Sequence, residues 1–168
     1  MSSKQCRTTT TTVPSIKTDK ILVQKIVSWY TVLKDTFDLK NFFNTIKTIA
    51  VIGLSNKAAR PSHKVASYLQ SQGFRIIPVN PKEKEVLGEK AYPDLLAIPK
   101  EIHIDVVDIF RRSEDVMPHV RETIQRGDAK TIWMQEGIIN QEAEELATQK
   151  GLNVIMNFCL MKAHKTSV

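Results

Sequence analysis

The fold is decided by residues 48–81, which read TIAVIGLSNKAARPSHKVASYLQSQGFRIIPVNP. The short apolar run Thr48–Ile52 ends at Gly53, a pattern typical of a strand buried on both faces. The segment Ser62–Ser71 places its apolar residues on one face, which predicts a helix that Ser62 caps and Gly73 ends. Phe74–Val79 predicts a second strand. A strand, a loop, a helix and a strand in this order predict a right-handed crossover between two parallel strands.

The same alternation continues along the rest of the chain. Strands are expected at Ile104–Phe110, Lys130–Met134 and Leu152–Met156, and helices at Ser113–Gln125, capped by Ser113, and at Gln141–Lys150. A short extended segment is expected near Glu89–Tyr92, followed by a helical turn at Asp94–Ala97. We therefore expect an α/β protein with a doubly wound parallel sheet and helices on both faces. Ligands of such sheets bind at the carboxyl ends of the strands, where the strand order reverses.

The first 45 residues precede this alternation and differ from it in composition. Residues 1–18 contain five consecutive threonines and no acidic residue, so we expect a disordered tail. Residues 19–45 predict a helical extension, with one helix at Asp19–Leu33 and a second at Leu39–Ile46, capped by Asp38. We expect these helices to pack against a folded domain at residues 46–164. The alternative is that Trp29 and Tyr30 meet a protein partner or a second copy of the chain.

Length, charge and cysteine content narrow the class of protein. The chain has 168 residues, which suits one domain, and no apolar run approaches the roughly 18 residues of a membrane span. The net charge is +6, but residues 1–45 carry +4 of it, so nucleic-acid binding is an unlikely main function. Only Cys6 and Cys159 are present, which cannot form a disulfide framework and favours a reducing compartment. We expect a cytoplasmic protein, with organelle import as the alternative because the start is rich in Ser and Thr.

The loop after the first strand carries the first set of candidate binding residues. Gly53, Ser55, Lys57, Arg60 and Ser62 lie between that strand and the start of a helix, where backbone N–H groups and the positive end of the helix dipole favour an anion. Only the first glycine of the dinucleotide fingerprint G-x-G-x-x-G is present, and the Gly-Lys-Ser/Thr of a P-loop is missing. The loop therefore favours a phosphate ligand without matching either motif.

The ends of the next two strands add further candidates. Asn80 stands where NAD enzymes place an acidic residue for the ribose hydroxyls, and Lys82 favours a phosphate there instead. The bond between Asn80 and Pro81 is a candidate cis peptide. Arg111 and Arg112 follow Phe110 directly, so we expect one arginine to reach the ligand and the other a carboxylate or solvent.

Six blocks of sequence in order resemble a known family. They are Ile49–Ser55, Arg60–Ser62, Ile77–Pro81, Val86–Gly88, Val107–Arg112 and Trp133–Gly137. Over about residues 46–164 the chain looks like the small stand-alone CoA-binding proteins, which share the fold of the CoA-binding domain of succinyl-CoA synthetase alpha subunits. The segment between Cys159 and His164 departs from the family, because Ala163 stands where an acidic residue is usual.

The resemblance implies a Rossmann-like domain that holds coenzyme A or an acyl-CoA. Carried over by position, Gly53, Ser55 and Arg60 cradle the phosphates, and Asn80, Pro81 and Lys82 line the nucleotide cleft. Phe110, Arg111 and Arg112 would stand opposite them. Gln135 and Gly137 would border the pantetheine side.

Catalytic patterns are missing from the sequence. None of the motifs H-x-x-x-H, C-x-x-C and G-x-S-x-G occurs, so we expect neither a metal nor acyl-transfer chemistry. Asp108 is a plausible partner for one of the arginines, and Cys159 could form a mixed disulfide with the thiol of CoA. The sequence thus predicts a non-catalytic or auxiliary CoA-binding module. The alternatives are an NAD(P)-dependent oxidoreductase and an interaction protein that acts through its N-terminal helices, where Trp29, Tyr30, Phe42 and Phe43 could form an apolar interface.

Overall fold

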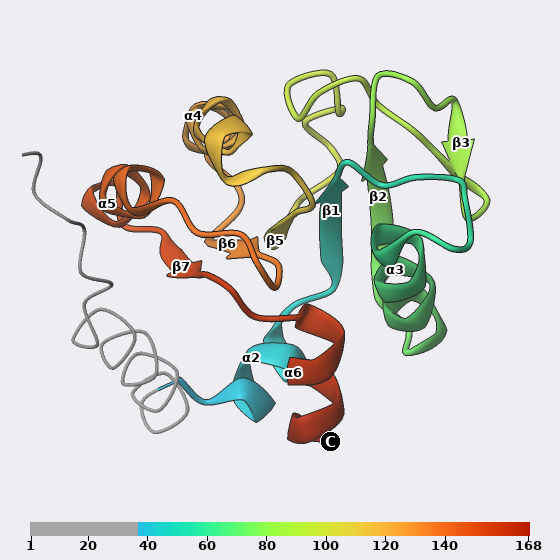
Figure 1. The fold of residues 1–168 in the computed structure, drawn as a ribbon, viewed down its shortest axis with the longest axis horizontal. Coiled ribbons are helices and arrows are strands. Elements are labelled where there is room, and N and C mark those ends of the chain that lie inside the picture. The colour runs from blue at the N-terminus through green and yellow to red at the C-terminus, as the bar shows by residue number, and fades with distance from the viewer. Residues whose placement is uncertain (1–36) are drawn as a thin grey trace, which may run out of the picture. The chain divides into compact units, whose positions relative to one another are not determined.

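Five parallel strands form the central sheet of the computed structural model, which describes residues 37–168. They are β1 (Thr48–Ile52), β2 (Arg75–Val79), β5 (Val106–Ile109), β6 (Thr131–Met134) and β7 (Asn153–Ile155), in the order β2-β1-β5-β6-β7. The expected doubly wound α/β fold, Rossmann-like in its layers, is therefore confirmed (Figure 1). The chain moves outward from β1 to β2 and then returns to β5 on the other side of β1, so the strand order reverses between β1 and β5.

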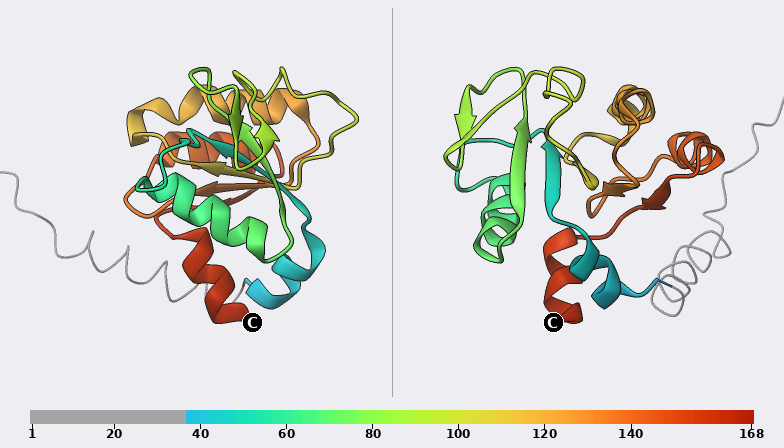
Figure 2. Two further views of the ribbon diagram at one scale, coloured as in Figure 1. Left: turned by 90° about the vertical axis from the view of Figure 1, so that its right-hand side faces the viewer. Right: turned by 180° about the vertical axis from the view of Figure 1, so that it is seen from behind.

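Helices cover both faces of this sheet. α4 (Met117–Arg126) and α5 (Gln141–Gln149) lie on one face, where they bury an aliphatic core against alternate residues of the strands. α3 (Pro61–Ser71), α6 (Leu160–Ser167) and α2 (Leu39–Thr45) lie on the other face (Figures 1 and 2). A single turn of 3-10 helix, η1 (Ser113–Asp115), follows β5.

A small hairpin extends the edge of the molecule beside β2. β3 (Glu85–Val86) and β4 (Glu89–Lys90) pair antiparallel through Leu87 and Gly88, which both have positive φ angles, 56° and 75°. Two such residues between paired strands are typical of a type I′ turn. Tyr92 then bridges to Val79 at the end of β2. The sequence analysis predicted only the second half of this unit, the extended segment near Glu89–Tyr92.

The helix caps differ from two of the predictions. Ser62 does not cap α3: Arg60 occupies the cap position, and the Ser62 hydroxyl accepts a hydrogen bond from the Ser55 N–H instead. Ser113 does not cap a long helix either, because η1 and α4 replace it, and the Ser113 hydroxyl accepts from the Ile139 N–H. Both hydroxyls tie two loops together. The predicted cap Asp38 is confirmed at the start of α2.

An aromatic cluster holds α2 and α6 on the sheet. Phe42 stacks on Trp133 with ring centroids 5.8 Å apart, and Phe43 meets the edge of His164 at 4.9 Å. Phe42 and Phe43 are both buried, so these two residues do not form the exposed interface patch that the sequence suggested. α6 itself was not predicted. The expected tail 1–18, the expected helix Asp19–Leu33 and its Trp29 and Tyr30 lie outside the described residues.

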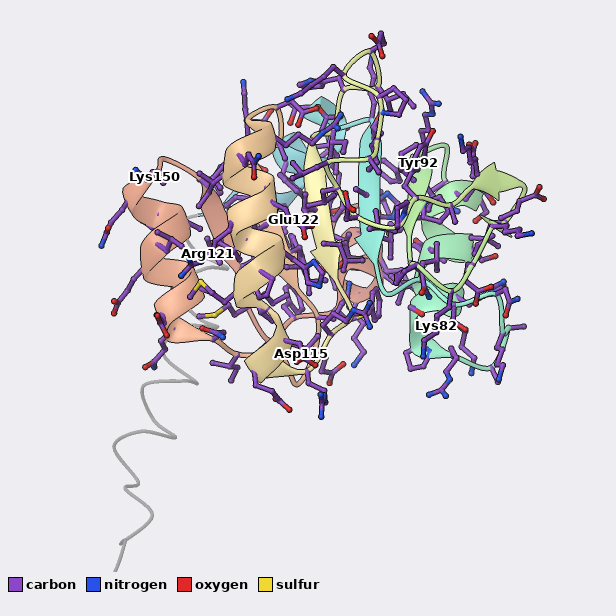
Figure 3. All side chains as sticks on the ribbon, turned by 90° about the horizontal axis from the view of Figure 1, so that it is seen from above. Lys82, Tyr92, Asp115, Arg121, Glu122 and Lys150 are labelled. Atoms are coloured by element: carbon purple, nitrogen blue, oxygen red, sulfur yellow. The ribbon has the colours of Figure 1, made fainter. Side chains whose placement is uncertain are left out.

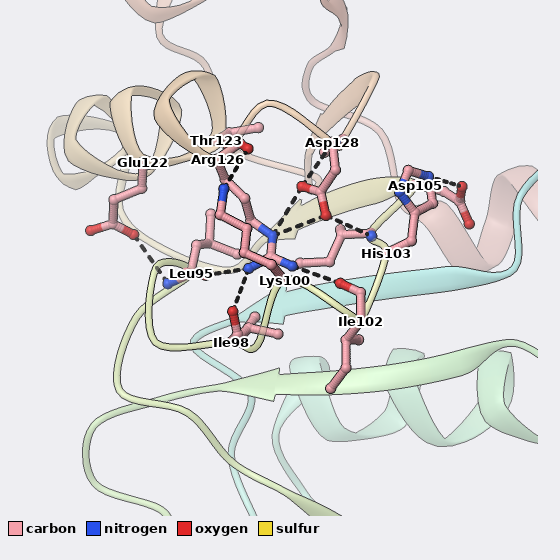
Figure 4. Close-up of polar contacts among 12 residues, drawn as sticks. Leu95, Ile98, Lys100, Ile102, His103, Asp105, Glu122, Thr123, Arg126 and Asp128 are labelled. Atoms are coloured by element: carbon pink, nitrogen blue, oxygen red, sulfur yellow. Dashed lines mark hydrogen bonds and ion pairs between the residues drawn. The ribbon is translucent and has the colours of Figure 1, made fainter.

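One buried arginine fixes the long connection between β4 and β5. Arg126, at the end of α4, donates to the carbonyls of Leu95 and Ile98 at 3.1 and 2.6 Å, and to those of Pro99 and Ile102 at 3.1 and 2.6 Å (Figure 4). Its Nε atom lies 2.9 Å from a carboxylate oxygen of Asp128. Every guanidinium nitrogen is thus used, and an irregular segment without ladder hydrogen bonds is held in place.

Candidate functional site

A cavity of about 640 Å³ opens at the carboxyl ends of β1 and β5, where the strand order reverses. Eight of the thirteen residues predicted for the site line it: Gly53, Ser55, Arg60, Ser62, Phe110, Arg111, Arg112 and Gln135. Six further residues line it: Pro61, Val65, Asp115, Glu136, Ile138 and Cys159. Of these six, the sequence analysis connected only Cys159 with the ligand, through a mixed disulfide with CoA. Their positions depend on how α3, η1 and the start of α6 dock, which a local pattern does not reveal.

Gly53, the residue after β1, lies close to the backbone of Phe110, the residue after β5. Its φ angle is +81°, and a Cβ atom at this position would lie 2.5 Å from the carbonyl oxygen of Phe110. Any side chain would therefore collide with backbone, and only glycine adopts this conformation without strain. Gly53 therefore lets the loop after β1 pass close to Phe110 at the wall of the cavity.

Hydrogen bonds hold the loop between β1 and α3 in one shape. The Asn80 side-chain amide donates to the Leu54 carbonyl at 2.8 Å, and the Ser55 N–H donates to the Ser62 hydroxyl at 3.3 Å. The Asn56 N–H donates to the Glu83 carboxylate at 3.2 Å. The loop is thus preorganised by side chains from its own helix and from the end of β2.

The first turn of α3 faces the cavity without a cap. The residue at the cap position, Arg60, makes no side-chain hydrogen bond to the helix, and Pro61 follows it in the first turn. Arg60, Pro61 and Ser62 all line the cavity. An uncapped helix start carries unsatisfied N–H groups and a partial positive charge, so this wall favours an anionic group.

The two adjacent arginines have different surroundings. Arg112 is exposed, and its guanidinium lies 2.9 Å from Asp115 and 3.4 Å from Glu114. The hydrogen bond that Arg112 donates to Asp115 and the charges of both acids raise the pKa of Arg112. Arg111 is half-buried, and its buried Nε atom has no hydrogen-bond partner in the described part of the chain. The expectation that one arginine pairs with a carboxylate is met by Arg112, which leaves Arg111 as the cation aimed at the cavity.

Asp108 lies fully buried in the layer beneath the cavity. Its Oδ1 atom accepts from the Gln135 amide at 2.7 Å, whereas Oδ2 has no hydrogen-bond partner among the residues that the structure describes. The prediction that Asp108 pairs with one of the arginines is wrong: Arg112 pairs with Asp115 and Glu114, and no ion pair among residues 37–168 involves Asp108. Desolvation raises the pKa of Asp108 to about 7, and the hydrogen bond from Gln135 counteracts this only in part.

The remaining five predicted site residues lie outside the lining of this cavity. Lys57, Pro81 and Lys82 are exposed, and Figure 3 shows Lys82 toward the same sheet edge as Asp115. Both polar groups of the Asn80 side chain bind backbone: the amide donates to the Leu54 carbonyl, and Oδ1 accepts from the Lys82 N–H. Gly137 donates to the Asn157 side chain at 2.8 Å. The bond between Asn80 and Pro81 is trans, so the suggested cis isomer is not present.

A second cavity of about 380 Å³ lies between α2, the turn after α3 and the end of α6. His164 lines this second cavity, and its Nδ1 atom shares a hydrogen bond of 3.0 Å with the Tyr68 hydroxyl. Burial lowers the pKa of His164. Within residues 37–168, no group of three or more His, Cys, Asp or Glu side chains could hold a metal ion, and no helix is long and apolar enough to cross a membrane.

Comparisons with known proteins identify the family to which this site belongs. Residues 47–165 match a family described as CoA binding domain. The chain belongs to this CoA-binding domain family. The matched range covers the whole sheet and every residue that lines the cavity at the β1–β5 edge.

Small relatives of the CoA-binding domain match the chain over most of their length. The uncharacterized protein YneT of Bacillus subtilis is 43% identical over 129 residues, covering 76% of this chain and 92% of that protein. The solved structure of a hypothetical protein from Pyrococcus horikoshii superposes with a TM-score of 0.73 at 39% identity, covering 77% of this chain and 89% of that one.

A larger relative of the CoA-binding domain is an enzyme. The ADP-forming acetate–CoA ligase II of Archaeoglobus fulgidus is 31% identical over 111 residues, which are 64% of this chain. The matched region makes up only 16% of that ligase.

Proposed function

We propose that this protein binds coenzyme A or an acyl-CoA in the cavity at the carboxyl ends of β1 and β5. One observation carries the proposal: in a chain of the CoA-binding domain family, the cavity at the reversal point joins an uncapped helix start to the guanidinium groups of Arg60 and Arg111. The ligands of open α/β sheets bind at this edge. CoA combines a pyrophosphate with a flexible arm, and the cavity offers a cationic end and a less polar one.

The cationic end suits the pyrophosphate. The first turn of α3 and the loop that starts at Gly53 present backbone N–H groups, and a guanidinium can form two parallel hydrogen bonds to a phosphate. Arg111 supports this placement, because its buried Nε atom has no hydrogen-bond partner among residues 37–168. Lys57 and Lys82 are exposed and lie outside the cavity. We propose that the adenosine extends past the loop and that these lysines bind its further phosphate.

The other end suits the pantetheine arm. Val65, Phe110 and Ile138 give this part of the lining an apolar character, with the Gln135 amide and Cys159 beside them. A thiol or thioester at the end of the arm would come to rest near Gln135 and Cys159. We propose binding without ligation, because the match to the ligase covers 16% of that enzyme and does not carry its reaction to this chain.

The alternative, an NAD(P)-dependent oxidoreductase, is less well supported, because the end of β2 lacks the acidic residue that usually binds the ribose. The residue at this position, Asn80, uses its side chain to hold Leu54 and Lys82. It offers the ribose no carboxylate, which is the group that dinucleotide enzymes commonly place there.

Calorimetric titration tests the proposal. The full chain, stripped of bound nucleotide, is titrated with CoA, NAD, NADP and ATP, together with the variants Arg111→Ala and Arg121→Ala. We expect selective binding of CoA and a loss of roughly tenfold or more in affinity for Arg111→Ala, since hydrogen bonds to charged groups contribute about 1.5–3 kcal/mol. Arg121→Ala, exposed on α4 (Figure 3), serves as the matched control and should bind as the wild type does. No heat with CoA, or equal binding of NAD, would overturn the proposal.

A further inference from the structure

Cys159 lines the cavity at the carboxyl ends of β1 and β5 and is shielded from bulk solvent. It lies between β7 and α6, is 7% exposed, and occupies the cap position of α6 without a side-chain hydrogen bond. It is the one cysteine in the described part of the chain, and its thiol is free. A buried thiol beside an open cavity is accessible only to a molecule that enters the cavity.

A second, independent feature of the cavity points to a ligand. Two buried side-chain atoms in the described residues have no hydrogen-bond partner, Asp108 Oδ2 and Arg111 Nε, and both belong to this site. In the sheet register Asp108 lies between Val51 and Trp133, and two residues further along the same strands stand Phe110, Gly53 and Gln135, all of which line the cavity. Asp108 itself does not line the cavity, but its carboxyl group is hydrogen-bonded to Gln135, which does.

Gln135 links this carboxyl group to the cysteine segment. Its Nε2 atom donates to Asp108 Oδ1 at 2.7 Å, and its Oε1 atom accepts from the N–H of Leu160, the residue after Cys159, at 3.4 Å. Gln135 is thus held by hydrogen bonds to both Asp108 and Leu160, whereas the Asp108 Oδ2 atom has no hydrogen-bond partner among the described residues. Buried polar atoms are normally paired, so the two orphan atoms fit a site that a polar ligand completes.

We infer that Cys159 is a site of reversible disulfide formation with coenzyme A, supplied as a CoA disulfide. This inference rests on the proposed function. The Cys159 thiol loses its proton, and the thiolate attacks the CoA sulfur of CoA–S–S–R. The Sγ–S(CoA) bond forms as the S–S bond to R breaks, and the leaving thiolate R–S⁻ takes up the proton. The disulfide reactant is the oxidant, so one disulfide is exchanged for another.

The cavity selects this disulfide over others. CoA would be held by its phosphates at the far end, which raises the local concentration of its sulfur at Cys159, whereas a disulfide without a nucleotide has no such anchor. Acyl transfer to Cys159 has less support. Its oxyanion would need free N–H donors, and the N–H that follows the cysteine already donates to Gln135.

Intact-protein mass spectrometry tests the inference. The reduced full chain is incubated with CoA disulfide or with glutathione disulfide, before and after treatment with a thiol reductant, alongside Cys159→Ser, Cys159→Ala and Cys6→Ser. Cys6 lies outside the described residues and provides the matched control. We expect one reductant-sensitive CoA adduct in the wild type and Cys6→Ser, none in either Cys159 variant, and formation at least tenfold faster than with glutathione disulfide.

Three results would overturn the inference: an adduct that persists in the Cys159 variants, equal rates with both disulfides, or a wild type that binds CoA but forms no adduct. Titration of Cys159→Ser and Cys159→Ala with reduced CoA separates this failure from failure of the proposed function. If these variants bind CoA and no adduct forms in the wild type, only the disulfide chemistry is wrong. If the wild type binds no CoA and Cys159 reacts with any disulfide alike, the CoA site itself is wrong.

Discussion

Gly53 lines the cavity, and its missing side chain lets the loop after β1 pass close to the Phe110 backbone. Gly53→Ala would bring Cβ within 2.5 Å of the Phe110 carbonyl oxygen at a φ angle of +81°. We expect this variant to lose CoA binding and to lose about 1–3 kcal/mol more free energy of unfolding than Gly88→Ala. Gly88 has a similar φ angle, +75°, but nothing within 4 Å of the added atom, so it isolates the backbone strain of about 1–2 kcal/mol. Urea unfolding of both variants measures the difference, and equal losses would contradict the role of Gly53.

Asp108 gives stability a specific dependence on pH. The folded protein holds the Asp108 proton up to a pKa of about 7, whereas the unfolded chain releases it near 3.8. The folded state therefore binds more protons in this window, and the free energy of unfolding should fall as the pH rises from about 4 to about 7. Between about pH 5 and pH 8 this contribution is about 2–3 kcal/mol.

The variant Asp108→Asn isolates this effect. His164 acts in the opposite direction, since its lowered pKa makes stability rise with pH in the range just below 6.5. We therefore expect the wild type to lose more stability than Asp108→Asn when both are unfolded in urea at about pH 5 and pH 8. Parallel changes in the two proteins would show that Asp108 is ionised in the folded state at the lower pH.

Some residues of the site could be predicted from their neighbours in the sequence, whereas others depend on contacts between distant elements. Gly53, Arg60 and Arg111 were predicted because each directly follows a strand or precedes a helix, and strand ends of a parallel sheet share an edge. The pairing of Asp108 with Gln135 could not be predicted, because it depends on the register between β5 and β6. The hydrogen bond from the Asn80 side chain to the Leu54 carbonyl could not be predicted either, since an amide can bind a backbone group or a ligand equally well.

Arg126 shows how one side chain can hold a whole segment, and it carries the prediction for the elements. Arg126→Ala would remove the guanidinium donor from four carbonyl groups and the buried cation beside Asp128, so we expect a loss of about 3–5 kcal/mol in the free energy of unfolding. CoA affinity should stay unchanged where the protein is folded, because the Arg126 contacts lie at the entry to β5, opposite the cavity. Arg121→Ala on the same helix changes only an exposed side chain and should lose less than about 0.5 kcal/mol. A similar loss in both variants would contradict this account.

The strands were easier to predict than the ends of the helices. All five strands of the sheet were expected, since buried parallel strands read as continuous apolar runs. The caps of α3 and α4 were misassigned because a serine before an apolar stripe can bind either its own helix or a neighbouring loop. α6 escaped prediction because its buried face, Leu160, Ala163 and His164, is too short to show a clear period.

At the scale of the whole molecule, residues from Asp38 onward form one compact unit. We expect the chain shortened to residues 38–168 to fold and to bind CoA within about twofold of the full chain, because α2 and the complete cavity are retained. Removal of residues 1–45 should instead destabilise the protein, since Phe42 and Phe43 are buried in the aromatic cluster. Thermal unfolding and calorimetry of the two shortened chains measure both effects. A tenfold loss of CoA affinity in 38–168 would show that the N-terminal part contributes to the site.

The crystal structure of the full chain grown with saturating CoA tests the central claim most directly. We expect the pyrophosphate at the first turn of α3, in contact with Arg111, and the sulfur end of the arm beside Gln135 and Cys159. CoA bound in the cavity beside His164, or no CoA between β1 and β5 in well-ordered crystals, would contradict the proposed site.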